Sequence, residues 1–128
     1  MNCCMRERLL EYLDKNNIRG DIHKDIVSFR SDGLNFVCQF YDDDPYYFRL
    51  MLPRIGKKDS DSLQQITSSI NLRFKVAKLI DVEGEPWLVA ESFVYSSENG
   101  ELLIARLVRL LTDVYNYYYM QMRQTNAE

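Results

Sequence analysis

The segment from Leu102 to Met122 is apolar over far more of its circumference than a surface helix needs. At about 100° per residue, its polar side chains crowd into about a third of the helical wheel. These polar residues are Arg106, Arg109, Thr112, Asp113, Asn116 and Arg123. Such a helix must be covered on two sides. One cover is its own sheet, and the other is the N-terminal helix, a second copy of the chain or a client protein.

The rest of the chain divides into segments with helical or alternating apolar periodicity. The expected elements are a helix at 2–16, strands at 26–30, 34–41 and 46–52, a helix from 59–62 to about 71, strands at 73–82 and 87–95, and the last helix. Turn residues separate neighbouring strands, as at Ser31-Asp32-Gly33. The order α-β-β-β-α-β-β-α predicts a single α+β domain over residues 1–124, in which the first three strands form an antiparallel meander. Residues 125–128 are expected to form a frayed C-terminal tail.

Composition limits the classes of function. The chain has 128 residues, of which 46% are hydrophobic and 27% charged, as in an ordinary globular domain. A net charge of −3 and a pI near 5.2 argue against binding to nucleic acid. No stretch approaches the roughly 18 apolar residues of a membrane span, and the three cysteines indicate reduced thiols. We therefore expect a cytoplasmic protein that binds neither nucleic acid nor a membrane.

Residues with catalytic or metal-binding chemistry are few. His23 is the single histidine and stands in a polar stretch without a nucleophile beside it. A structural zinc site needs four Cys or His ligands at short spacings, which the sequence lacks. The acidic run 42–44 has neither the glycine nor the closing glutamate of an EF-hand, so it predicts a solvated turn. Cys38 alternates with Phe36 and Phe40, which indicates a core residue. The sequence predicts no catalytic residue, no metal and no cofactor.

Tyrosines are concentrated near the end of the last helix. Tyr115 and Tyr118 share a helix face with the aliphatic residues and are expected in the core, whereas Tyr117 and Tyr119 flank that face. Interface cores favour such aromatic and aliphatic clusters with few charges. The predicted dimer or partner surface is Leu107, Leu110, Val114, Tyr117 and Tyr119.

A resemblance to a known family is carried by the segment from Ser69 to Leu111. It consists of a helix ending at Ile70-Asn71, a strand with Phe74, Val76 and Leu79, a turn at Glu83-Gly84, and a strand with Trp87, Leu88, Ala90 and Glu91. Together with the element order, it resembles the YbjN-like group, whose fold looks like that of type III secretion chaperones. The resemblance implies a twisted antiparallel sheet flanked by helices, dimerisation, and a role in regulation or in holding a client segment. Asn71 is the one motif position carried over, and its structural interpretation is a helix C-cap.

These observations favour a non-enzymatic domain that binds a protein or peptide through apolar surfaces, as a homodimer. An edge strand could also accept an extended peptide. The alternative is a small-molecule-binding domain or an enzyme with a pocket between sheet and helices. That alternative needs convergent polar groups, for which Arg49, Asn71 and Glu91 are the candidates. A third interpretation, a subunit of a larger complex, predicts a chain that aggregates alone.

Overall fold

The computed structural model describes residues 5–56, 63–93 and 99–127, with side chains described as far as residue 124. Within these ranges, helices and strands follow in the order α1 (Met5–Lys15), β1 (Gly20–His23), β2 (Ile26–Ser31), β3 (Leu34–Tyr41), β4 (Asp44–Leu52), α2 (Leu63–Arg73), β5 (Ala77–Val82), β6 (Glu85–Phe93) and α3 (Gly100–Ala127). The predicted α+β class is confirmed. The capping residues expected for the second helix, at 59–62, lie outside the described residues.

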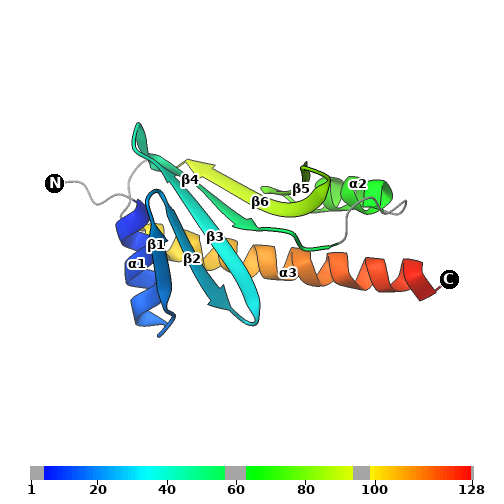
Figure 1. Cartoon of the computed structure of the whole chain (residues 1–128), viewed down its shortest axis with the longest axis horizontal. Coiled ribbons are helices and arrows are strands. Elements are labelled where there is room, and N and C mark those ends of the chain that lie inside the picture. The colour runs from blue at the N-terminus through cyan, green and yellow to red at the C-terminus, as the bar shows by residue number, and fades with distance from the viewer. Residues whose placement is uncertain (1–4, 57–62, 94–98, 128) are drawn as a thin grey trace.

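The strands form one open antiparallel sheet in the order β1-β2-β3-β4-β6-β5 (Figure 1). In three of the hairpins, the strands are joined by tight turns that contain residues with positive φ. Asp32 and Gly33 have φ of 51° and 78°, and Glu83 and Gly84 have φ of 54° and 86°. Two consecutive positive φ values define the type I′ turn, whose twist matches that of the flanking strands. In the two-residue turn between β1 and β2, only the first residue, Lys24, has a positive φ, of 56°. The hairpin turn expected at 31–33 is confirmed.

The three helices cover one face of the sheet and one of its edges. Helix α3 runs along the whole molecule against that face, α1 lies at the β1 end, and α2 lies beside β5 (Figure 1). Alternate strand residues point into the core beneath them. The fully buried strand residues include Val27, Phe36, Cys38, Phe48, Leu88 and Ala90, which pack against Met5 and Leu9 of α1 and Ile104 and Leu111 of α3.

The wide apolar face of α3 finds its second cover within the same chain. Helix α1 packs against its first half, where Lys15 forms an ion pair with Glu101 at 2.8 Å. Helix α2 packs against its second half, where Ser69 and Tyr117 share a hydrogen bond of 2.6 Å between their hydroxyls. Of the three covers that the sequence left open, the N-terminal helix is therefore present, and α2 adds to it.

One strand differs from the sequence-based expectation. Residues 20–23 form strand β1, where no strand was expected from the sequence, so the observed order is α-β-β-β-β-α-β-β-α. None of the four is buried, because β1 is an edge strand that has only β2 beside it among the described strands. An exposed edge strand has no buried face, and it therefore lacks the alternation from which strands are predicted.

Candidate binding face of the sheet

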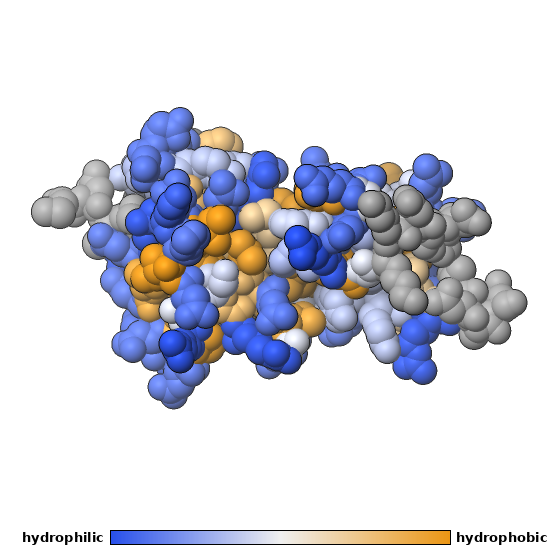
Figure 2. All heavy atoms as spheres, in the orientation of Figure 1, coloured by the Kyte–Doolittle hydropathy of each residue, from blue (hydrophilic) through white to orange (hydrophobic). Residues whose placement is uncertain are grey.

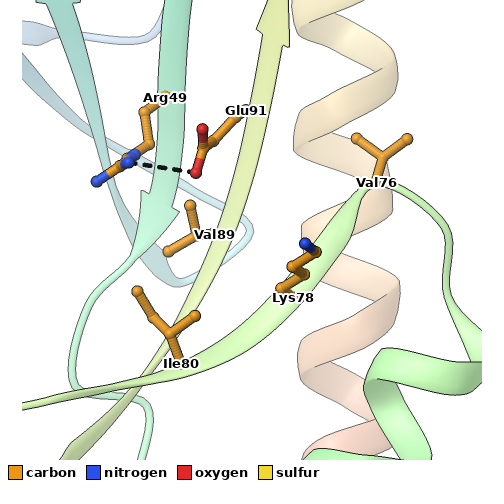
Figure 3. A pocket seen from close by; sticks show the side chains of 6 residues that line it. All are labelled: Arg49, Val76, Lys78, Ile80, Val89 and Glu91. Atoms are coloured by element: carbon orange, nitrogen blue, oxygen red, sulfur yellow. Dashed lines mark hydrogen bonds and ion pairs between the residues drawn. The ribbon is translucent and has the colours of Figure 1, made fainter.

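The second face of the sheet carries none of the described helices. Its residues alternate with the core residues, and include Tyr47, Arg49 and Met51 on β4 and Val89 and Glu91 on β6. The two strands are neighbours, with Arg49 opposite Glu91 and Met51 opposite Val89. In Figure 3, α3 passes behind β5, and the side chains of Arg49, Val89 and Glu91 lie on the side of the sheet that faces the viewer. We call the side of the sheet that bears these residues the open face.

The strand register arranges the middle of the open face as an apolar row. Val37 on β3 lies opposite Met51 on β4, which lies opposite Val89 on β6. Met51 and Val89 are only 6% and 4% exposed, although they do not belong to the helix-covered core. In the space-filling view, apolar residues gather over β2, β3 and β4, with hydrophilic residues around them (Figure 2). The centre of the face is therefore apolar and little exposed.

An aromatic row lies beside the ends of the same strands. The ring centroids of Tyr41 and Tyr47 are 5.1 Å apart, and those of Tyr47 and Phe93 are 4.7 Å apart. In both pairs, the two rings are tilted relative to each other. Such pairs hold each other in place and add to the free energy of burial. Phe93, at the outer end, is 73% exposed. The row is therefore an apolar surface whose outer end, at Phe93, remains accessible to a partner.

A polar network separates the aromatic row from the apolar row. Arg49 forms an ion pair of 3.2 Å with one carboxylate oxygen of Glu91, and the hydroxyl of Tyr47 donates a hydrogen bond to the other. Partial burial and the hydrogen bond to Glu91 raise the pKa of the Tyr47 hydroxyl, so it remains a donor at neutral pH. Both oxygens of Glu91 therefore have donors, which suits an anchoring group better than a general base.

A hollow of about 260 Å³ opens between this network and strand β5 (Figure 3). It is lined by Arg49, Val76, Lys78, Ile80, Val89 and Glu91. Arg49 and Glu91 neutralise each other, whereas Lys78 is exposed and forms no ion pair with another described residue. The hollow therefore combines apolar walls with one uncompensated positive charge, and it suits a carboxylate attached to an apolar group.

The polar residues expected to line one pocket lie in two different parts of the structure. Arg49 and Glu91 meet at the hollow, but Asn71 lies on α2 beside the edge of β5. Its Oδ1 accepts a hydrogen bond from the Leu79 backbone N–H at 2.9 Å, and its Nδ2 donates to the Leu79 carbonyl at 3.4 Å. Because α2 continues to Arg73, Asn71 lies in its last turn, and its side chain pairs with the strand.

The predicted surface on α3 is largely occupied within one chain. Leu107 and Val114 are buried in the core. Tyr117 is half-buried and its hydroxyl contacts Ser69 of α2. As a dimer or partner surface, the set stays a prediction. Its more accessible members are Leu110, which is half-buried, and Tyr119, which is 50% exposed.

Several open-face residues were not identified from the sequence, in particular Met51, Lys78, Val89 and Phe93. A signal for them exists in β6, where Trp87, Val89 and Phe93 alternate with the core residues Leu88 and Ala90. A strand with apolar residues on both faces indicates that both faces are shielded. That pattern shows that a second apolar face exists, but the partners of β6 across the sheet come from elsewhere in the chain.

The other candidate chemical groups lie apart from the open face. Cys38 is buried in the core, as expected, and burial raises the pKa of its thiol, so it is a poor nucleophile. His23 is exposed on β1, and Asp42 and Asp43 form an exposed hairpin turn. Among the described residues, no three His, Cys, Asp or Glu side chains gather as metal ligands would. No helix in the described part of the chain is long and apolar enough to cross a membrane.

Comparison with known proteins identifies a solved structure with a similar fold. No protein-family model matches the chain, and no curated protein matches its sequence. The crystal structure of YbjN from E. coli, described as a proposed transcription regulator, is similar with a TM-score of 0.59 and 15% sequence identity. The match covers 94% of this chain and 93% of the YbjN chain. The resemblance expected from the sequence is thus confirmed for the fold, which the two chains share over nearly their whole length.

Proposed function

We propose that this chain is a non-enzymatic binding domain that holds an extended apolar segment of a partner protein on the open face of its sheet. The observation that supports this most directly is the aromatic row next to the shielded apolar row. Exposed aromatic rings around well-packed aliphatic side chains are typical of interface cores. Lys78 adds a site for one carboxylate. The segment that fits combines aromatic or aliphatic side chains with an acidic residue.

A small-molecule site is the second candidate. The hollow of about 260 Å³ is slightly smaller than the roughly 300–1,000 Å³ of most ligand pockets. A larger hollow of about 390 Å³ lies between α2 and β5, lined in part by Thr67, Ser68 and Asp81. A thermal-shift screen against metabolites and nucleotides tests both hollows as ligand sites, because a specific ligand raises the melting temperature by mass action. A hit would favour this second candidate, and its loss in Lys78→Glu would assign the ligand to the smaller hollow, which Lys78 lines.

We further propose that any regulatory role works through contact with a protein. YbjN is described as a proposed transcription regulator. This chain has a net charge of −3 and a pI near 5.2, which disfavours direct binding to DNA because DNA is bound mainly through clustered lysine and arginine. The cytoplasmic location expected from the sequence belongs to the same proposal.

The proposal is tested with a library of random dodecapeptides displayed on phage and panned against the purified chain. Clones that also bind the Phe93→Ser variant are removed. We expect the remaining peptides to be rich in aromatic and aliphatic residues and to carry an aspartate or glutamate. Peptides without such a pattern, or no enrichment over the counter-selected pool, would contradict the proposal.

Matched variants locate the binding surface. Phe93→Ser and Lys78→Glu change exposed residues of the open face, so they leave the core intact. Leu72→Ser removes an apolar side chain that is 89% exposed on α2, away from this face. We expect the first two to weaken a peptide selected without this counter-selection by about tenfold or more, which corresponds to about 1.4 kcal/mol. Leu72→Ser should leave its affinity unchanged.

A further inference from the structure

The two edges of the sheet differ in how their backbone groups are paired. In an antiparallel hairpin with a two-residue turn, the pair that closes the turn is hydrogen-bonded, and bonded and non-bonded pairs then alternate. Counting from Val82 and Glu85, the N–H and C=O of Leu79 point away from β6. Asn71 bonds to both of them, which confirms the count. The β5 edge is thus closed at its centre by a side chain of the same molecule.

The same alternation of bonded and non-bonded pairs shows that backbone groups at the β1 edge are unpaired. The turn at Lys24 and Asp25 is closed by the pair His23 and Ile26, so Ile22 and Val27 form a non-bonded pair. The N–H and C=O of Ile22 therefore point outward, and no described residue bonds to them. The Ile22 side chain is 57% exposed. An edge strand with outward backbone groups and an exposed apolar side chain is a template for another strand.

We propose that β1 pairs with the β1 of a second copy of this chain, antiparallel and centred on Ile22. Two symmetric registers overlap three residues of this strand. The first places Asp21 opposite the second copy's Asp21, and like charges directly opposite each other are destabilising. The second places Ile22 opposite Ile22 and Asp21 opposite His23, so two apolar side chains meet and each carboxylate faces an imidazole. Charge therefore selects the register in which the outward groups of Ile22 bond to each other.

The register also determines what the dimer does with its open faces. The twofold axis that relates the two β1 strands is perpendicular to the sheet, so each face continues into the same face of the second copy. The two open faces then lie on one side of a continuous sheet. A partner segment longer than one open face can run from one copy to the other. Helix α3 takes no part in this dimer.

The proposal is tested by light scattering on a sizing column at several concentrations. The mass of the wild-type chain should rise with concentration from 15.2 kDa towards twice that value. Ile22→Pro removes the outward N–H and leaves the bonds between β1 and β2 in place, because proline is tolerated at outward edge positions. This variant should stay at 15.2 kDa. Ile22→Val retains the N–H and should associate like the wild type.

A charge exchange provides a second test that does not depend on proline. Asp21→Lys places a cation opposite His23 and should weaken association, whereas the double variant Asp21→Lys/His23→Glu exchanges the charges and should restore it. Failure of the double variant to recover would overturn the register. A wild-type chain of constant 15.2 kDa, or an Ile22→Pro variant that still associates, would overturn the edge pairing. Loss of association in Tyr119→Glu alone would assign the contact to α3 instead.

Discussion

Asn71 pairs with Leu79 as a neighbouring strand would, with one hydrogen bond accepted from its N–H and one donated to its C=O. The carboxamide thus replaces a peptide group at the free edge of β5. Unpaired strand edges are templates for aggregation, and proteins commonly cover them. A single side chain of α2 therefore holds the helix beside the sheet and closes the edge at its middle.

Replacing Asn71 should open this edge. We expect Asn71→Ala to lower the free energy of unfolding by about 0.5–1.5 kcal/mol, the net value of hydrogen bonds partly replaced by water. Asn71→Asp keeps the acceptor for the Leu79 N–H and should lose less. Urea unfolding gives the free energies, and light scattering shows whether the alanine variant aggregates more. Equal stability of wild type and Asn71→Ala would mean that the pair does not contribute.

The contact between Gly56 and Tyr118 predicts a coupled pair of substitutions. A Cβ at Gly56 would clash with the Tyr118 hydroxyl oxygen, and Tyr118 is buried. Gly56→Ala should therefore cost about 1–3 kcal/mol, as overpacking does. The hydroxyl has no hydrogen-bond partner among the described residues, so Tyr118→Phe alone should be neutral or stabilising. In a double-mutant cycle of thermal unfolding, Tyr118→Phe should reduce the cost of Gly56→Ala. Simple additivity would contradict the close contact.

Tyr117 joins α2 to α3, and its substitutions should separate packing from hydrogen bonding. Its ring packs edge-on against the ring of Phe74, with 5.4 Å between the ring centroids. Its hydroxyl oxygen lies 2.6 Å from the hydroxyl oxygen of Ser69, within hydrogen-bond distance. We expect Tyr117→Phe to cost about 1 kcal/mol for the hydrogen bond. Tyr117→Ala should cost about 3 kcal/mol because it also removes the ring. Chemical denaturation measures both, and equal losses would show that the ring packing is unimportant.

Cys38 should make stability fall in alkali. Burial raises the pKa of its thiol in the folded state, whereas an unfolded thiol ionises near about 8.5. The stabilisation is complete below the unfolded pKa and is lost as the pH rises above it, by up to about 1.4 kcal/mol per pH unit. Unfolding curves in a Cys3→Ser/Cys4→Ser background should show this slope, and Cys38→Ala should reduce it. In the same background, a thiol reagent should react with Cys38 only after unfolding.

The sequence predicts those features that local pattern and turn chemistry determine. Cys38 was correctly placed in the core because Phe36 and Phe40 alternate with it. The turn at Asp32 and Gly33 follows from residues that accept positive φ. Strand β1 was missed because none of its residues is buried, so no periodicity marks it.

The candidate site could be predicted only in part, because it depends on which strands are neighbours. Strand β6 lies between β4 and β5, and this order brings Phe93 to Tyr47 and Glu91 to Arg49. No local signal specifies that order. The surface expected on α3 depended on the same information, since α1 and α2 cover residues that would otherwise be available to a partner.

The most direct test of binding on the open face uses the fluorescence of Trp87, the single tryptophan of the chain, which lies on that face. A peptide selected on the wild-type chain, without the counter-selection on Phe93→Ser, is titrated into the wild type, Phe93→Ser and Leu72→Ser. We predict a change in Trp87 emission with wild type and Leu72→Ser at the same affinity, and about tenfold weaker binding to Phe93→Ser. Unchanged Trp87 emission on binding, or equal affinity for all three proteins, would contradict the account.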